Sequence, residues 1–284
     1  MSRENISPEE KKQALIKRLS GIDSALVAFS GGVDSSFLLA MAARHIKKTG
    51  AVSVRSEFVT DEEFFDAENA SSKAGIPFYT LSFDVFSDAK VISNPPERCY
   101  YCKKKIFTDI KALAERENFQ TILEGTNADD VYDIRPGMKA VKETGALSPL
   151  LDAGLTKDEI RSLSKEEGIE GWDRPSNSCL ATRIPSGDRI TLLALTMAAG
   201  AERAIRKIGI DNVRVRCERD NARIEVDKKD IPLLLNGEIS EVIVRGLKSL
   251  GFKRISVDLE GYKNPADFQE NNESEKRTAL PSSD

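Results

Sequence analysis

The sequence predicts an α/β protein, with a doubly wound parallel sheet and a smaller C-terminal α+β domain. Short apolar stretches alternate with helical segments through the first two thirds of the 284 residues, and this alternation is typical of parallel sheets with crossover helices. A glycine-rich turn, SGGVDS at 30–35, joins an apolar stretch to a helical one, which is where such sheets bind phosphates. After about Pro185 a helix is followed by two stretches of alternating polarity, which indicates a second domain.

Composition and charge disfavour several classes of protein. The net charge is −4, so we expect no nucleic acid partner without a local basic patch. No stretch approaches the ~18 consecutive apolar residues of a membrane span, and the N-terminus lacks an apolar signal core. We therefore expect a cytoplasmic protein with no membrane partner. Four irregularly spaced cysteines do not fit a secreted disulfide framework, and the single histidine, His45, disfavours a zinc site built on several histidines.

The elements of the first domain follow from caps and periodicity. Ser7, Pro8 and two acidic residues predict a helix that runs to about Leu19. Short apolar stretches predict strands, which are expected at 24–29, 51–58, 77–83 and 121–124. Helices are expected at 36–48, from Thr60 to about 74, at 101–118 and from Thr156 to about 167, and both threonines open capping boxes with a glutamate three residues later.

The second domain is predicted to span residues 185–263, after a first domain of residues 1–184. Its expected elements are a helix at 190–208, a hairpin of 213–217 and 222–226, helices within about 228–250 and a strand at 253–259. Residues 264–284 are polar and poor in apolar side chains, so we expect a disordered tail.

The SGGVDS turn has the composition of a phosphate-binding loop. Gly31 and Gly32 let the backbone approach an anion without a Cβ clash, and the following helix adds partial positive charge from its N-terminus. Ser30 and Ser35 supply hydroxyl donors, while Asp34 suits Mg²⁺, a ribose or a role in orienting the loop. A plain strand-to-helix turn is the alternative. The string resembles the PP-loop of the ATP pyrophosphatase superfamily, and this resemblance implies that ATP binds at the carboxyl edge of the sheet.

The stretch EGTNADD, residues 124–130, follows the next predicted strand. Because the carboxyl ends of parallel strands share one edge of a sheet, we expect it near the glycine loop. Gly125 and Thr126 are therefore candidate ATP contacts, and Glu124 and Asp129 are candidate ligands of Mg²⁺, which prefers oxygen. A solvated acidic turn is the alternative. Arg135, in the following DIRPG stretch, is a candidate for neutralising phosphate charge.

Cys99 and Cys102 form a CxxC pair that three lysines follow, and Cys179 lies in a later stretch, CLATRIP. In a reducing compartment a CxxC pair indicates metal or redox chemistry. The residues by themselves leave a metal site, a dithiol redox pair and two buried thiols open.

Five motifs, taken together, resemble the LarE family over roughly residues 10–260: SGGVDS, PPERCYYCKKKIF, EGTNADD, DIRPG and CLATRIP. This family comprises the pyridinium-3,5-biscarboxylic acid mononucleotide sulfurtransferases of nickel-pincer cofactor biosynthesis. The resemblance implies an enzyme that adenylates a pyridinium carboxylate mononucleotide with ATP and Mg²⁺, releases pyrophosphate and forms a thiocarboxylate. A sulfide donor and a homo-oligomeric state are implied as well.

The cysteines distinguish two subtypes of that family. In one, a single cysteine that matches Cys179 gives up its own sulfur. Members with three such cysteines resemble cluster enzymes, so the resemblance implies that Cys99, Cys102 and Cys179 are catalytic and hold a [4Fe-4S] cluster with one iron open for sulfide. Arg98 and the three lysines would offset the cluster charge and lower the thiol pKa values. Zinc, a dithiol redox pair and sacrificial use of Cys179 are the alternatives.

The predicted hairpin has one apolar and one polar face. Cys217 shares the apolar face with Val213 and Val215, so we expect it in the core. The candidate substrate-binding residues lie on the polar face or near it in the sequence, and they are Arg183, Glu202, Arg214, Arg216, Arg223 and Glu225. The resemblance implies that the mononucleotide phosphate binds Arg214 and Arg216. A solvated strand face is the alternative.

Three other functions remain open from the sequence. A tRNA thiolation enzyme shares the PP-loop and three cysteines, but the net charge of −4 and the lack of further CxxC pairs count against it. An amide-forming ligase like NAD synthetase would not need the cysteines. A non-catalytic nucleotide sensor would release no pyrophosphate.

Overall fold

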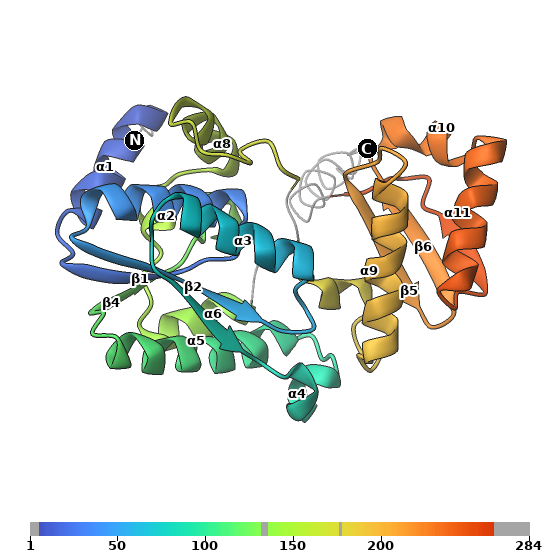
Figure 1. Cartoon of the computed structure of the whole chain (residues 1–284), viewed down its shortest axis with the longest axis horizontal. Coiled ribbons are helices and arrows are strands. Elements are labelled where there is room, and N and C mark those ends of the chain that lie inside the picture. Colours follow the sequence, from blue (N-terminus) through green and yellow to red (C-terminus); the bar gives the residue numbers. More distant parts are fainter. Residues whose placement is uncertain (1–5, 132–135, 176–177, 264–284) are drawn as a thin grey trace, which may run out of the picture. The chain divides into compact units, whose positions relative to one another are not determined.

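The computed structural model of the chain describes residues 6–131, 136–175 and 178–263 (Figure 1). These residues form two compact units. The first unit contains the described residues up to 181 and the stretch 186–190, and the second contains 182–185 and 191–263. The predicted division into domains of residues 1–184 and 185–263 stays a prediction. The predicted disordered tail, 264–284, and Arg135 lie outside the described residues.

A parallel sheet forms the centre of the first unit. Its strands within the described residues are β1 (Ser24–Ala28), β2 (Lys48–Arg55), β3 (Phe78–Ser82) and β4 (Thr121–Leu123). Their order is β3-β2-β1-β4, and every pair is parallel, so the predicted parallel sheet is confirmed. Because β2 and β4 lie on opposite sides of β1, the chain diverges at the carboxyl ends of β1 and β4. Open α/β sheets bind ligands at such switch points.

Helices cover both faces of this sheet, so the predicted doubly wound arrangement is confirmed (Figure 1). A core cluster that includes Phe37 and Ile160 fills one side, and a cluster that includes Phe107 and Val141 fills the other. The helices on the first side are α1 (Pro8–Leu19), α2 (Val33–His45), α3 (Asp61–Lys73) and α8 (Lys157–Glu166). The helices on the second side are α5 (Arg98–Arg116) and α6 (Pro136–Thr144).

Capping boxes begin three of these helices, α1, α3 and α8. In each, a Ser or Thr side chain accepts from the backbone N–H three residues on, and the glutamate there accepts from the cap backbone. Such caps stabilise a helix by about 1 kcal/mol. Shorter elements complete the unit: η1 (Val85–Ser87), α4 (Ala89–Ile92), η2 (Ala128–Val131), α7 (Pro149–Asp152) and η3 (Leu180–Arg183), the last of which leads into the second unit.

Several element boundaries differ from the prediction by a few residues, and two of these differences are informative. β2 begins at Lys48, where the sequence predicted the end of a helix. The reason is that Ile46 is extended and buried in the core, and Lys48 already pairs with Ser24 of β1, so sheet pairing overrides local helical preference. Helix α5 begins at Arg98 rather than at 101. Both cysteines of the CxxC pair therefore lie within the first turns of a helix.

The second unit has its own sheet and core. The predicted hairpin of β5 (Val213–Glu218) and β6 (Asn221–Val226) is antiparallel, and β7 (Arg254–Val257) pairs with β6 in parallel. The helical elements are α9 (Leu192–Arg206), η4 (Lys228–Asp230), α10 (Ile231–Leu234) and α11 (Gly237–Ser249). Cys217 is buried, as predicted, and burial raises the pKa of its thiol to about 11. Within the described part of the chain, none of the helices combines the length and apolar character needed to cross a bilayer.

Candidate active site

The glycine loop, residues 30–35, leads from β1 into α2 at the switch point of the sheet. Gly31 has a φ of 76°, and a Cβ there would lie 3.2 Å from the Cβ of Ala67 on α3. The Ser35 hydroxyl donates to the Gly32 carbonyl at 3.0 Å and lies 3.2 Å from the Ser30 hydroxyl. Gly32 caps α2 without a side-chain hydrogen bond, so the first-turn N–H groups of the helix are available to an anion.

The loop after β4 packs directly onto this glycine loop. A Cβ on Gly125 would lie 3.2 Å from the backbone nitrogen of Ser35 and 3.3 Å from its Cα. A Cβ there would make tighter contacts than most real Cβ atoms do, so glycine favours this close approach of the two loops. The structure therefore brings together two of the sequence motifs, as predicted from the shared edge of the sheet, and gives Gly125 a packing role there.

Asp34 belongs to a polar cluster that the sequence only partly revealed. Its Oδ2 accepts from Asn127 Nδ2 at 3.1 Å. Asn127 is fully buried, and its backbone N–H donates to Asp130 Oδ2 at 3.2 Å. Asp130 Oδ1 lies 3.9 Å from Lys157 Nζ at the start of α8. Burial raises the pKa of Asp34, although Lys157 and the Asn127 hydrogen bond oppose the rise.

Three members of this cluster, Asn127, Asp130 and Lys157, were missed as site residues. Asn127 and Asp130 stand in the quoted EGTNADD motif, so the signal was present, but only the fold shows that Asn127 joins Asp34. Nothing in the sequence indicated Lys157, because a lysine that follows a helix cap is ordinarily a surface residue.

Glu124 and Asp129, the predicted Mg²⁺ ligands, both accept hydrogen bonds from the protein. The buried Glu124 carboxylate accepts from Thr126 Oγ1 at 2.7 Å and from the Ser148 hydroxyl. Asp129 Oδ2 accepts from the backbone N–H of Lys157 at 2.7 Å, which ties the loop to the start of α8. Their contacts shape the loop, whereas Asp34 and Asp130 share Asn127, which adds Asp130 to the candidate ligands.

The three cysteines of the predicted sulfur site gather in the first unit. Cys99 and Cys102 are partly buried on α5, and Cys179 is exposed. Burial and, after it, the nearby thiols of Cys179 and Cys99 raise the pKa of Cys102 to about 12. Arg98 and Lys103 lower the pKa of Cys102, as predicted, but the net shift is upward. Burial outweighs Arg98 and Lys103 there, and the other two lysines pair with Glu143 and Asp109.

This site lies at the same edge of the sheet as the glycine loop. Helix α5 returns from the carboxyl end of β3 to the start of β4, so its N-terminus, with Cys99 and Cys102, is at the carboxyl edge. Leu180, next to Cys179, donates its N–H to the carbonyl of Phe58, just after β2, at 3.1 Å. Both cysteine-bearing segments are therefore anchored at the edge where the glycine loop lies.

A set of three cysteine thiols is, by its chemistry, the kind of donor set that binds iron–sulfur clusters. The thiols of Cys179 and Cys99 both affect the pKa of Cys102, and the guanidinium of Arg98 approaches Cys99 Sγ to 3.6 Å, where it can balance the negative charge of such a group. Among the described residues, no group of three or more His, Cys, Asp or Glu side chains is arranged to hold a metal ion.

A buried ion network surrounds Glu202 in the second unit. Arg183 donates to it with Nε at 2.6 Å and with Nη2 at 3.2 Å, and both side chains are only 2–3% exposed. Arg206 Nη2 and the backbone N–H of Val215 donate to the same carboxylate at 2.9 and 3.1 Å. Burial would raise the pKa of Glu202, but the hydrogen bond and charge of Arg183 outweigh it and the pKa is lowered.

The polar face of the hairpin is confirmed by its register, which pairs Arg214 with Glu225 and Arg216 with Arg223. Arg216 donates to Glu225 with Nε at 3.0 Å and Nη2 at 2.7 Å, and Arg223 donates to Glu225 and Asp258, each at 2.7 Å. Arg214 is 1% exposed and lies over the Tyr262 ring at 5.0 Å. This face is a dense network of ion pairs, in which Arg216 and Arg223 are partly exposed.

The parallel sheet, the glycine loop at its switch point and the adjoining loop after β4 define a protein of the PP-loop ATP pyrophosphatase class. No family model matches the chain. It is 33% identical over 258 residues to the pyridinium-3,5-bisthiocarboxylic acid mononucleotide synthase of Lactiplantibacillus plantarum, covering 89% of this chain and 92% of the synthase. It is 34% identical over 258 residues to an uncharacterized protein of Synechocystis, covering 90% of this chain and 96% of that protein.

The chain therefore belongs to the family of this synthase, the LarE family. A more distant match, 27% identical over 206 residues, is the tRNA-specific 2-thiouridylase of Rickettsia africae, with 57% of this chain and 54% of that enzyme covered. Both named relatives make products that carry sulfur. The chain is accordingly a sulfurtransferase enzyme.

Proposed function

We propose that this enzyme uses ATP to convert a carboxylate of a pyridinium mononucleotide into a thiocarboxylate, as a step of nickel-pincer cofactor biosynthesis. One observation carries the proposal: the phosphate loop and three cysteines share the carboxyl edge of a single parallel sheet. An adenylating site beside a sulfur site is what this chemistry requires. The full-length similarity to the pyridinium-3,5-bisthiocarboxylic acid mononucleotide synthase supports the choice of substrate.

Adenylation is the first step, and the glycine loop binds the phosphates of ATP for it. The loop N–H groups with Ser30 and Ser35 hold the departing pyrophosphate. Asp34, held by Asn127, takes part in binding Mg²⁺ with the neighbouring carboxylates. A carboxylate oxygen of the substrate forms a bond to the α-phosphorus, and the bond from that phosphorus to the bridging oxygen of pyrophosphate breaks. The product is an acyl adenylate, whose carbonyl carbon is a good electrophile.

Sulfur transfer is the second step. Cys99, Cys102 and Cys179 would hold a [4Fe-4S] cluster, which would supply sulfide when bound. A carbon–sulfur bond forms at the acyl carbonyl, the carbon–oxygen bond to AMP breaks, and the proton of hydrosulfide goes to solvent. No electrons are gained or lost, so no further oxidant is needed. A second round would produce the bisthiocarboxylic acid.

The arginines of the second unit are proposed to bind the mononucleotide. Arg216 and Arg223 are partly exposed, so an incoming phosphate can replace Glu225 as their partner. The buried Arg214, Arg183 and Glu202 then support this surface from below. Arg216 also donates to the Thr182 carbonyl at 2.8 Å, which connects it to the segment that follows Cys179.

One observation favours a second candidate, the sacrificial use of Cys179. Its thiol is exposed, whereas Cys99 and Cys102 are partly buried, so Cys179 is the most accessible of the three thiols for attacking an acyl adenylate. A tRNA thiolation enzyme is the further alternative, and binding of bulk tRNA on filters, weakened by salt, would support it.

Oxygen-free protein tests the proposal. Purified protein should contain iron and acid-labile sulfide, absorb visible light, and turn over repeatedly with ATP, sulfide and the pyridinium dicarboxylate mononucleotide. Mass spectrometry should then find Cys179 intact. One turnover with loss of the Cys179 sulfur would establish the sacrificial route, and colourless protein with stoichiometric zinc would exclude the cluster.

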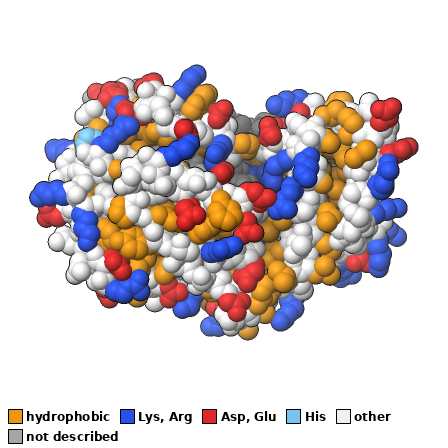
Figure 2. Space-filling model, in the orientation of Figure 1, with side chains coloured by type: hydrophobic (Ala, Val, Ile, Leu, Met, Phe, Trp, Pro, Cys, Tyr) orange, Lys and Arg blue, Asp and Glu red, His pale blue; other side chains and the backbone are white. Residues whose placement is uncertain are grey.

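We further propose that the enzyme is a cytoplasmic homo-oligomer that receives sulfide from a donor. Large hydrophobic side chains are exposed on the second unit, including Leu192, Leu193, Leu235 and Leu259, and hydrophobic side chains are visible on its surface in Figure 2. Contiguous exposed apolar surface is typical of association sites. Sedimentation equilibrium should show an oligomer, and a monomer at micromolar concentration would contradict it.

A further inference from the structure

A buried arginine joins the two segments that carry the cysteines. Arg98 is 8% exposed. Its Nη1 donates to Asn94 Oδ1 at 2.6 Å and to the carbonyl of Ala181 at 3.0 Å, and its Nη2 donates to Cys99 Sγ at 3.6 Å. Ala181 is two residues after Cys179 in the sequence. One planar guanidinium thus contacts the CxxC helix and the segment of the third cysteine, 83 residues away.

Asn94 fixes the same pair of segments from the other side. It is 1% exposed and has a φ of 56°, a conformation that asparagine tolerates better than most residues. Its carbonyl accepts from the N–H of Gly187 at 2.8 Å, and the carbonyl of Ile92 accepts from the N–H of Ile190 at 2.8 Å. The segment that begins at Cys179 is therefore held at both of its ends, near residue 181 and near residues 187–190.

The burial of Arg98 indicates a positional role rather than simple charge balance. A surface arginine would balance charge without the cost of desolvation, and a buried guanidinium is tolerated only when its donors are satisfied. Its fork of donors has fixed directions, so three acceptors at once define where each of them lies. A lysine carries a point charge on a flexible stem and cannot define all three positions.

We propose that Arg98, oriented by Asn94, is a positioning residue that keeps Cys179 within reach of Cys99 and Cys102. The purpose of this arrangement rests on the proposed function, because a three-thiol sulfur site needs the third thiol in place before the cofactor arrives. The arrangement itself is a property of the folded chain and is measurable without iron, ATP or substrate.

The experiment uses the full chain without cofactor and a bifunctional reagent that bridges two nearby thiols. Peptide mapping then measures bridges from Cys179 to the CxxC pair, relative to bridges within that pair. The pair sits three residues apart on one helix, so its internal bridge does not depend on the link to Ala181. A general loss of stability would affect both kinds of bridge, whereas loss of the Arg98 link would lower only the bridges from Cys179. A thermal melt of each variant confirms that it is folded.

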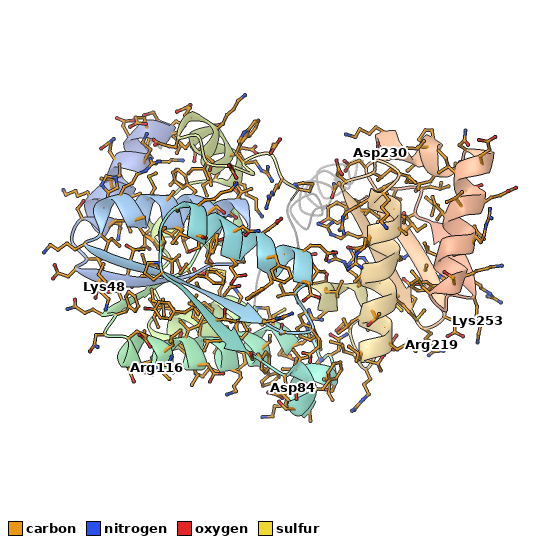
Figure 3. The ribbon with its side chains drawn as sticks, viewed as in Figure 1. Lys48, Asp84, Arg116, Arg219, Asp230 and Lys253 are labelled. Atoms are coloured by element: carbon orange, nitrogen blue, oxygen red, sulfur yellow. The ribbon has the colours of Figure 1, made fainter. Side chains whose placement is uncertain are left out.

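Arg98→Met should lower this ratio about tenfold, because the lost hydrogen bonds involve a charged donor. Arg98→Lys should restore little of it, and Asn94→Gly, which keeps the positive φ but loses the amide, should lower it about threefold. Two matched controls should leave it unchanged. Arg116→Met changes an arginine at the opposite end of α5 (Figure 3), and Asn118→Gly changes an asparagine with the same φ of 56°.

The outcomes separate this inference from the proposed function. A wild-type ratio in folded Arg98→Met and Asn94→Gly overturns the positioning role, whether or not the protein binds iron. A lowered ratio supports it, even if wild-type protein fails to take up iron and sulfide and the cluster proposal falls. If Arg98→Met does not fold, Asn94→Gly decides between these results.

Discussion

Buried arginines occur in both units, but their partners differ. Arg98 in the first unit donates to an amide oxygen, a backbone carbonyl and a thiol, so none of its partners among the described residues carries a fixed charge. Arg183 in the second unit makes a two-point ion pair with Glu202. The first site therefore keeps positive charge beside three thiols, where an anionic group is expected. In the second site the buried arginine is paired directly with a carboxylate, so an anion that binds Arg183 must compete with Glu202.

The largest effect is expected when the buried ion pair between Arg183 and Glu202 is broken. Arg183→Met leaves the carboxylate of Glu202 buried beside fewer donors, and breaking a buried ion pair in this way costs about 3–5 kcal/mol. Urea unfolding should show this loss. Arg206→Met is the matched control, because it removes the partly exposed partner of the same carboxylate and should cost about 1 kcal/mol or less. Equal losses in both variants would show that the two ion pairs do not differ as described.

The phosphate loop supplies the next test, because Asp34 is an acid in a region expected to bind anions. Asp34→Asn should slow pyrophosphate release about 100-fold at saturating ATP, since it removes charge needed to place Mg²⁺ and phosphates. Asp61→Asn, at the exposed start of α3, should leave the rate unchanged. A normal rate in Asp34→Asn would mean that this carboxylate only shapes the loop.

A smaller effect is expected for Arg216, where the substrate phosphate is proposed to replace Glu225 as the partner. Arg216→Met should raise the KM for the mononucleotide about tenfold through the loss of a charged hydrogen bond. The rate of pyrophosphate release at saturating substrate should change little. Arg219→Met, at the turn of the same hairpin (Figure 3), serves as the control. Unaltered KM in Arg216→Met would place the mononucleotide elsewhere.

The smallest effect concerns pH. The folded pKa of Glu202 is lowered from its ordinary 4.5, so its ionisation stabilises the protein above pH 4.5, and this contribution is lost as the pH falls through the lowered value. The difference in unfolding free energy between the wild type and Glu202→Gln should therefore be largest near neutral pH and shrink below pH 4.5. A difference that stays constant with pH would show that Glu202 is not held as a carboxylate by Arg183.

Several predictions from the sequence were accurate because local physics decides them. Capping boxes at Thr60 and Thr156, the alternation of the hairpin and the glycine turn between strand and helix all depend on neighbours within a few residues. The start of β2 was wrong, since pairing of Lys48 with Ser24 is not a local property. The net upward shift of the Cys102 pKa was not predicted, because burial is set by the whole unit and here outweighs the lowering effect of Arg98 and Lys103.

The order of residues alone was enough to determine an α/β protein of this family with a phosphate loop and three cysteines. Periodicity, helix caps and residue chemistry depend on nearby residues, so they can be recognised from the sequence without knowledge of the fold. Only the tertiary structure decided that Asn127 holds Asp34, that Glu225 neutralises Arg216, and that Arg98 connects Ala181 to Cys99. Those contacts join residues far apart in the sequence, and they exist because strand order and burial bring their segments together.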